Sequence, residues 1–202
     1  MEIGGIVLAG GKGLRLGRDK LTETIGGRSL LQRVVSRLIP ICQEIIIVTA
    51  EERVIPRLTS PVKLKMATDI VPGKGPLGGV YTGLTKSDYD CNVVVACDMP
   101  FLNEALLRYM VGLSSGVDIV VPRVGDKVEP LHAVYSRNCI PAIEGMLKEG
   151  RLSVYKLLNL VKVRYVDAGE IERFDPKHLS FFNVNTRTDI EKARDLAGGM
   201  AG

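Results

Sequence analysis

The sequence has no tryptophan, and it contains only two histidines and four cysteines in 202 residues. The cysteines form no C-x-x-C pair, and His132 and His178 lie far apart, so the spacing gives neither a zinc signature nor a disulfide framework. Spacing alone also supplies no Ser-His-Asp or Cys-His arrangement for nucleophilic catalysis. We interpret the cysteines as buried or incidental thiols in a reducing cytosol.

Long apolar runs and blocks of one charge are also missing. No run approaches the roughly 18 apolar residues that a membrane span needs. The first residues lack the positive region of a signal peptide, so we expect a cytoplasmic protein with no membrane partner. The net charge is +4, with no basic block and no interleaving of aromatic and basic residues. Nucleic-acid binding therefore has little support.

What the chain does contain is an alternation of strand-like and helix-like runs. This order predicts right-handed βαβ crossovers, a mainly parallel Rossmann-like sheet and a single-domain three-layer α/β/α fold. We expect one domain over residues 1–197 and a flexible tail over 198–202. Apolar spacing and β-branched runs predict strands over 6–9, 45–48, 62–67, 93–96, 119–121, 131–135 and 162–166, and helices over 29–39, from 78, over 106–113, over 140–147 and after 186.

Two helix starts carry capping signals. Ser29 with Gln32, and Thr186 with Asp189, each fit a capping box, in which two side chains bind backbone N–H groups reciprocally. We expect helices to begin directly after Ser29 and Thr186.

A glycine-rich loop follows the first predicted strand. Residues 10–20 contain four glycines and four cations, which suit a loop that turns backbone N–H groups toward phosphates. Leu16 breaks the dinucleotide pattern G-x-G-x-x-G, and no stretch fits the P-loop pattern. From this segment alone, a phosphate site and a plain structural turn both remain open.

Two more loops follow strands at the predicted carboxyl edge of the sheet, where parallel α/β folds bind ligands. Asp69 precedes the glycine-rich run 73–79, which suits a base or ribose contact or an ordinary turn into a helix. Asp98 follows the strand 93–96 directly. Its carboxylate suits Mg²⁺, which typically takes one or two protein carboxylates plus phosphates, although a helix N-cap or a turn aspartate is the alternative.

These segments together resemble a known family. Residues 8–20 resemble the L-A-G-G-x-S-x-R-M-G-x-D-K signature of the molybdenum cofactor guanylyltransferases, within the nucleotide-diphospho-sugar transferase superfamily. Residues 75–79 and 97–100 look like the second and third motifs of that family. Residues 129–135 and 182–186 resemble its two later motifs, which separate it from the wider superfamily. The match runs from about residue 3 to residue 197.

The resemblance implies site residues. It assigns the catalytic residues as Lys20, Asp98 and Arg15, with Asp98 as the Mg²⁺ ligand. It assigns nucleotide contacts to Leu8, Ala9, Gly10, Gly11, Lys20, Asp69 and Asp98. Asn183 and Asn185 would lie on the molybdopterin side.

Four positions depart from the pattern of the family. Gly13 stands in place of the usual serine or alanine, and Leu16 in place of methionine, neither of which weakens the predicted site much. Thr49 replaces a nucleotide-contacting asparagine of some members. Arg187 replaces the proline usual after the Asn-Thr pair.

The implied reaction transfers GMP from GTP to the phosphate of molybdopterin and releases pyrophosphate. The expected partners are GTP and the molybdopterin cofactor, with molybdoenzymes or cofactor-delivery proteins as recipients. Alternatives are a molybdenum cofactor cytidylyltransferase, a sugar-1-phosphate nucleotidyltransferase and a non-catalytic nucleotide-binding module. Base choice between GTP and CTP does not follow from the residues alone.

Overall fold

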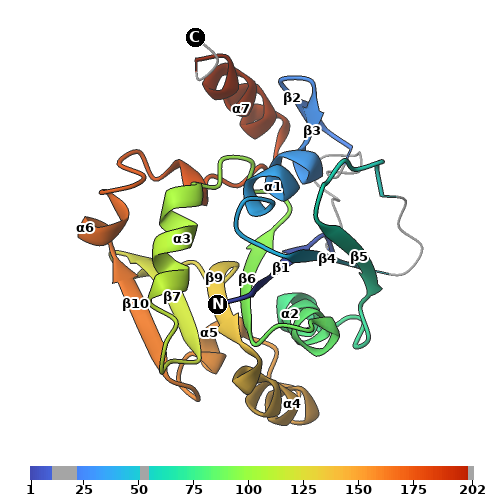
Figure 1. Ribbon diagram of the computed structural model, residues 1–202, viewed down its shortest axis with the longest axis vertical. Helices are drawn as coiled ribbons and strands as arrows, with labels where there is room; N and C mark the ends of the chain where they lie inside the picture. The colour runs from blue at the N-terminus through green and yellow to red at the C-terminus, as the bar shows by residue number, and fades with distance from the viewer. Residues whose placement is uncertain (11–21, 51–54, 200–202) are drawn as a thin grey trace.

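The computed structural model describes residues 1–10, 22–50 and 55–199, and its elements alternate as the sequence predicts (Figure 1). The strands are β1 (Ile3–Leu8), β2 (Thr24–Ile25), β3 (Arg28–Ser29), β4 (Glu44–Thr49), β5 (Lys63–Thr68), β6 (Cys91–Ala96), β7 (Ile119–Val124), β8 (Lys127–Val128), β9 (His132–Ser136) and β10 (Val163–Asp167). The helices are α1 (Leu30–Leu38), α2 (Gly75–Lys86), α3 (Glu104–Gly112), η1 (Arg137–Cys139), α4 (Ile140–Lys148), α5 (Val154–Leu157), α6 (Ala168–Ile171), η2 (Leu179–Phe181) and α7 (Arg187–Gly199).

The central sheet has the strand order β10-β7-β9-β6-β1-β4-β5, and β8 pairs with β7. Strands β6, β1, β4 and β5 are parallel neighbours, and β10 is parallel to β7. Strand β9 runs antiparallel to both β6 and β7, which it separates. The prediction of a mainly parallel sheet is confirmed, and the inserted antiparallel strand is a feature that the run of apolar residues did not reveal.

Two apolar layers cover the two faces of this sheet. Helices α1 and α3 pack on one face and α2, α4 and α5 on the other (Figure 1). Successive residues of one strand enter opposite layers: Val7 packs with α1, whereas Ile6 and Leu8 pack with α2. This two-sided burial explains why the parallel strands read as unbroken apolar runs. The three-layer prediction is therefore confirmed.

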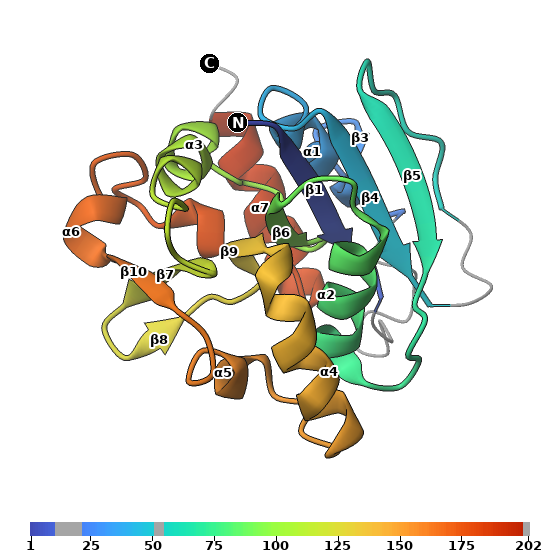
Figure 2. The same cartoon turned by 60° about the horizontal axis from the view of Figure 1, so that its bottom comes forward.

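Helices α2 and α4 lie side by side below the sheet (Figure 2). The Tyr81 hydroxyl of α2 donates to Glu144 Oε1 of α4 at 2.9 Å. Their approach to the sheet depends on small residues. A Cβ atom at Gly83 of α2 would come within 2.4 Å of Ile6 Cγ2 on β1. Glycine therefore lets α2 pack close to the strand that leads into the glycine-rich segment.

The capping signals are confirmed in one case and half-confirmed in the other. Asp189 Oδ2 accepts from the Thr186 backbone N–H at 2.8 Å, and Thr186 Oγ1 accepts from the Asp189 N–H at 3.2 Å. At α1, Ser29 Oγ accepts from the Gln32 N–H at 3.1 Å. The side chain of Gln32 instead bonds with the backbone of Thr59, because this distant segment supplies both a donor and an acceptor.

Helix α7 closes the fold beside the β2–β3 hairpin (Figure 1). Its apolar side chains Ile190 and Ala193 join a small cluster with Ile25, Phe101 and Val184. The helix extends through Gly199, and residues 200–202 lie outside the described part of the chain. Within that part, no helix combines the length and the apolar character needed to cross a membrane.

Candidate active site

The carboxyl ends of four parallel strands meet at one edge of the sheet. Register aligns Leu8 of β1 with Val48 of β4 and Ala96 of β6, and Thr49 of β4 with Thr68 of β5. Segments that follow these strands therefore begin side by side. The structure brings Ala9, Gly10, Asp69 and Asp98 to this edge, whereas the predicted site residues Gly11, Arg15 and Lys20 lie outside the described residues.

Backbone hydrogen bonds continue beyond the strands and fix the start of each loop. The Ala9 N–H donates to the Val48 carbonyl at 2.8 Å, and the Cys97 N–H donates to the Leu8 carbonyl at 3.1 Å. The Leu8 side chain is buried, and its methyl groups lie against Gly79 of α2. Because the Leu8 and Ala9 side chains belong to the core, any nucleotide contact at these positions falls to their backbone groups.

Asp69 organises the turn that leads into α2. Its Oδ1 atom accepts from the Val71 N–H at 3.0 Å and from the Thr82 hydroxyl at 2.9 Å. The Thr82 oxygen in turn accepts from the Ile70 N–H at 3.1 Å. Asp69 thus has a structural task within the protein, which the sequence had left open between a nucleotide contact and an ordinary turn.

Helix α2 begins at Gly75, not near Gly78 as the small-residue run suggested. Pro76 lies in its first turn, a position where proline costs no hydrogen bond. Gly73 and Gly75 have φ angles of 79° and 63°, which favour glycine. The helix therefore starts at the carboxyl edge of the sheet, with the N–H groups of its first turn at the end where anions are favoured.

Asp98 lies half-buried just beyond β6, where two other motifs bond to the turn and to the last residue of the strand. Its backbone carbonyl accepts from the Val184 N–H at 2.9 Å. The Ala96 N–H donates to the Leu131 carbonyl at 3.0 Å. The sequence motifs at 97–100, 129–135 and 182–186 are thus neighbours in space, held together by backbone bonds.

The segment 182–186 carries the two asparagines predicted for the acceptor side. Asn183 is half-buried, and its side-chain Nδ2 donates to the Phe181 carbonyl at 3.1 Å. Asn185 is exposed, and its backbone N–H binds Asp189 Oδ2 at 3.0 Å. Asn183 therefore shares its segment with the Val184 contact to Asp98, while Asn185 starts the cap of α7.

Two residues near this edge were not singled out from the sequence. Burial raises the pKa of the half-buried Glu129, which precedes the antiparallel strand β9. His132, the first residue of β9, is fully buried, and burial lowers its pKa to about 4. The only sequence signal for them is their place within the Glu-Pro-Leu-His motif. Isolated histidines and glutamates have no spacing that would reveal their burial.

Three of the cysteines are buried thiols, as expected. Cys42, Cys91 and Cys139 are buried, and burial raises the pKa of Cys42 and of Cys139 to about 12. They are therefore protonated at neutral pH and do not act as nucleophiles.

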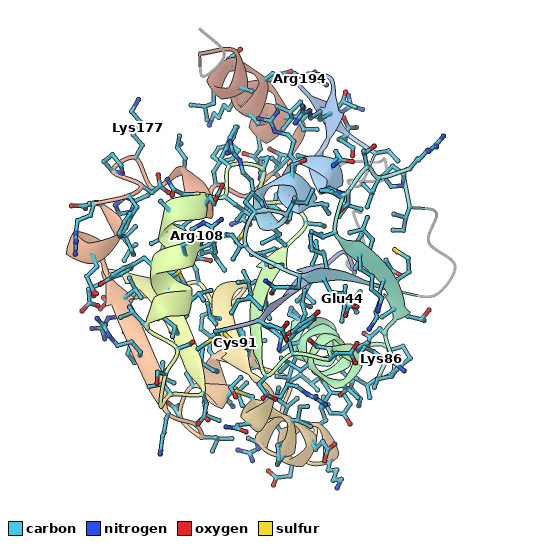
Figure 3. The ribbon with its side chains drawn as sticks, in the orientation of Figure 1. Glu44, Lys86, Cys91, Arg108, Lys177 and Arg194 are labelled. Carbon is cyan, nitrogen blue, oxygen red and sulfur yellow. The ribbon has the colours of Figure 1, made fainter. Side chains whose placement is uncertain are left out.

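The opposite edge of the sheet has a different character. Figure 3 labels Glu44 and Cys91, the first residues of β4 and β6, at this amino-terminal edge. The Glu44 carboxylate is 2% exposed and lies 3.0 Å from the amino groups of both Lys63 and Lys65. An open cavity of about 680 Å³ lies along the same edge, beside Asp90 and Asp118. It is separated by the length of the strands from the segments that carry the sequence motifs.

The donor set at the carboxyl edge can be compared with the needs of a divalent cation. Among residues 1–10, 22–50 and 55–199, no group of three or more His, Cys, Asp or Glu side chains could hold a metal ion alone. The carboxylate of Asp98, two residues beyond β6, is a hard oxygen donor of the kind that such an ion prefers. This set fits Mg²⁺ bound jointly by one carboxylate and substrate phosphates, and it does not fit a closed protein cage.

Comparisons with known proteins agree with this geometry. The family model of the MobA-like NTP transferase domain matches residues 5–165. A probable molybdenum cofactor guanylyltransferase of Pelotomaculum thermopropionicum is 38% identical over 98% of this chain and 94% of that protein. A molybdenum cofactor guanylyltransferase of Desulfosudis oleivorans is 33% identical over 94% of this chain and 93% of that protein.

Among solved structures, the molybdopterin-guanine dinucleotide biosynthesis protein A of Archaeoglobus fulgidus superposes with a TM-score of 0.82 and 26% identity. The superposition covers 98% of this chain and all of that one. The chain therefore belongs to the MobA-like NTP transferase family, alongside the molybdenum cofactor guanylyltransferases.

Proposed function

We propose that this protein transfers GMP from GTP to the terminal phosphate of molybdopterin, forming the guanine dinucleotide cofactor and pyrophosphate. The observation that carries the proposal is the convergence of the family's motifs at one sheet edge, where the Asp98 turn binds the 182–186 segment. The curated relatives that span nearly the whole chain are guanylyltransferases by name.

The reaction is an in-line attack of the molybdopterin phosphate oxygen on the α-phosphorus of GTP, in which the bond to the pyrophosphate leaving group breaks. The attacking phosphate is already ionised at neutral pH, so the step needs no general base. This agrees with His132, which is fully buried on β9 where that strand pairs with β6 inside the sheet, and is not available to a substrate. Catalysis then consists of positioning and charge neutralisation.

Each part of the site has a proposed task. The backbone of Leu8, Ala9 and Gly10 lies against the nucleotide, together with Gly11. Lys20 and Arg15 neutralise charge on the phosphates and on departing pyrophosphate. Asn183 contacts the acceptor, because its segment adjoins Asp98.

Asp98 would hold Mg²⁺ together with the substrate phosphates, and a bound ion would supply neutralisation of phosphate charge near the reacting atoms. Asp69 acts at the nucleotide by shaping the turn into α2, given its bonds to Val71 and Thr82. The cytosol is the proposed compartment, because buried thiols such as Cys42 suit a reducing environment.

The test is pyrophosphate release by the purified protein with molybdopterin and Mg²⁺, comparing GTP with CTP. We expect release with GTP and little with CTP. Preference for CTP would replace the proposal with a cytidylyltransferase. Binding of GTP without turnover in the presence of both molybdopterin and Mg²⁺ would favour the non-catalytic module. Turnover with a sugar 1-phosphate in place of molybdopterin would reassign the acceptor.

A further inference from the structure

Both histidines of the chain lie against the ring of Phe181, although they come from distant segments. The His132 ring meets Phe181 edge-on, with centroids 5.0 Å apart and an interplanar angle of 74°. The His178 ring also meets Phe181 edge-on, with centroids 6.2 Å apart and an interplanar angle of 80°. Phe181 is half-buried in η2, two residues before Asn183. Its position is therefore defined by aromatic packing.

Of the two histidines, His132 is the more deeply buried. The residue is 0% exposed, and neither ring nitrogen has a hydrogen-bond partner among the described residues. A buried polar ring without partners is less favourable than an apolar ring of similar shape. What the imidazole supplies to its neighbours is thus its shape and its aromatic edge.

The packing of His132 on Phe181 is connected to the acceptor side of the site through the backbone carbonyl of Phe181, the last residue of η2. The Phe181 carbonyl accepts from Asn183 Nδ2 at 3.1 Å, which orients the Asn183 amide. One residue further, the Val184 N–H binds the Asp98 carbonyl at 2.9 Å. A shift of Phe181 would therefore move the bond that orients Asn183, while the Val184 bond keeps the segment attached to the Asp98 turn.

His132 is itself anchored to the same edge. Strand β9 pairs His132 with Val95 of β6, and the neighbouring Leu131 carbonyl accepts from the Ala96 N–H at 3.0 Å. The imidazole, the Asp98 turn and the Asn183 segment are thus fixed to one another by short connections. The nucleotide loops after β1 and β5 are bonded to Val48 and Thr49 of β4, and the Leu8 carbonyl at the end of β1 also accepts from the Cys97 N–H.

We propose that His132 is a positioning residue for the acceptor, which sets Phe181 and through it the orientation of the Asn183 amide. This inference rests on the proposed function for its kinetic consequence. His132 touches no substrate. It selectively supports acceptor binding, and GTP binding does not depend on it.

The experiment compares His132→Ala, which removes the ring, with His132→Phe, which keeps a ring without nitrogens. We expect H132A to raise the KM for molybdopterin about tenfold, because small misplacements of a positioning group cost one to two orders of magnitude. The dissociation constant of GTP, measured by calorimetry, should not change. H132F should retain the wild-type KM, since the nitrogens bind nothing in the described protein.

A second readout requires no substrate. In a ¹⁵N–¹H spectrum of the free protein, H132A should shift the side-chain amide signals of Asn183, and H132F should leave them near their wild-type positions. Phe181→Ala should reproduce both effects of H132A, and it replaces that variant if H132A does not fold. Ile143→Ala is the matched control, because Ile143 is a fully buried residue in the apolar layer on the other face of the sheet.

The inference is overturned if H132A or F181A leaves both the acceptor KM and the Asn183 signals unchanged. It is also overturned if H132F behaves like H132A, or if I143A raises the acceptor KM equally. A wild-type protein that transfers no GMP would instead remove the proposed function. The Asn183 signals would still decide whether His132 positions that amide.

Discussion

The Val184 backbone N–H donates a 2.9 Å hydrogen bond to the carbonyl of Asp98. This bond joins the turn after β6, which carries the proposed metal ligand, to the segment that carries the proposed acceptor contacts. It uses only backbone groups, so it constrains the spacing of the two segments without constraining which side chains they carry. Donor and acceptor substrates can therefore be held at a fixed separation, which in-line transfer requires.

Replacing Asp98 should reduce turnover strongly with little loss of stability. Asp98→Asn keeps the backbone bond to Val184 and nearly the same side-chain shape, but it removes the negative charge. We expect a loss of about a hundredfold or more in kcat, equivalent to about 3 kcal/mol, as for removal of a principal electrostatic group. Steady-state pyrophosphate release at saturating GTP measures it. Asp88→Asn, an exposed carboxylate at the amino-terminal edge, should leave kcat unchanged. Wild-type turnover in D98N would remove the metal assignment.

Two substitutions of Asp69 separate a turn-forming role from a direct carboxylate contact. Asparagine keeps an oxygen that can accept from both Val71 and Thr82, whereas alanine removes both bonds. If Asp69 acts by shaping the turn, D69N should bind GTP like the wild type and D69A about tenfold more weakly, which corresponds to about one hydrogen bond's net contribution. Calorimetric titration with GTP decides the matter. Equal losses in both variants would show that the nucleotide needs the charge itself.

Burial of His132 should make stability depend on pH in the mildly acidic range. Its pKa falls to about 4 in the folded protein, from an ordinary value of 6.5. Between these values the unfolded chain binds a proton that the folded protein does not, so the free energy of unfolding decreases as pH falls. The contribution is complete above pH 6.5 and is lost toward pH 4, by about 2 kcal/mol at pH 5.

Urea unfolding of wild type and His132→Phe at pH 7 and pH 5 tests this dependence. Other titrating groups affect both proteins alike, so the difference between their slopes isolates His132. H132F should be at least as stable as the wild type at pH 7, because it removes an unpaired buried polar ring. Parallel pH profiles for the two proteins would show that the imidazole can be protonated without cost.

Two glycine-to-alanine substitutions should change the stability of the protein in opposite directions. Gly83→Ala should destabilise the protein by about 1–3 kcal/mol, because the new Cβ would lie 2.4 Å from Ile6 Cγ2 and force α2 away from β1. Gly145→Ala in α4 should stabilise by up to about 1 kcal/mol, since a Cβ there meets nothing within 4 Å and alanine favours helix. Thermal unfolding of the two variants provides the comparison. A melting temperature of G83A equal to that of the wild type would mean that α2 can move away from β1 without cost.

The local pattern of the chain predicted most elements to within a few residues. Buried parallel strands such as 45–48 and amphipathic helices such as α1 carry their own periodicity, because one chain segment determines which side chains face the core. The start of α2 was misplaced, since Gly73, Gly75 and Pro76 were read as a loop. The antiparallel direction of β9 was not predicted, because direction depends on the path between strands, which periodicity does not encode.

The candidate site was predicted unevenly for the same reason. The positions of Asp69 and Asp98 at the carboxyl edge were predicted because both lie within two residues of a strand end, and parallel strand ends share an edge. Their roles in the reaction stay predictions. The engagement of Asp69 by Thr82 and the packing of His132 on Phe181 were not predicted. Both depend on contacts between segments that are far apart in the sequence.

By itself, the sequence determined the fold class, the order of elements and the loops that follow each strand, because apolar periodicity and glycine placement are local properties. The tertiary structure alone decided which of those loops touch. It also decided that the Gln32 side chain would bind the Thr59 backbone and not cap α1. It further decided that the His132 imidazole would be buried without hydrogen bonds to the described residues. Such outcomes are set by long-range packing and by competition between distant hydrogen-bonding groups, which no single segment specifies.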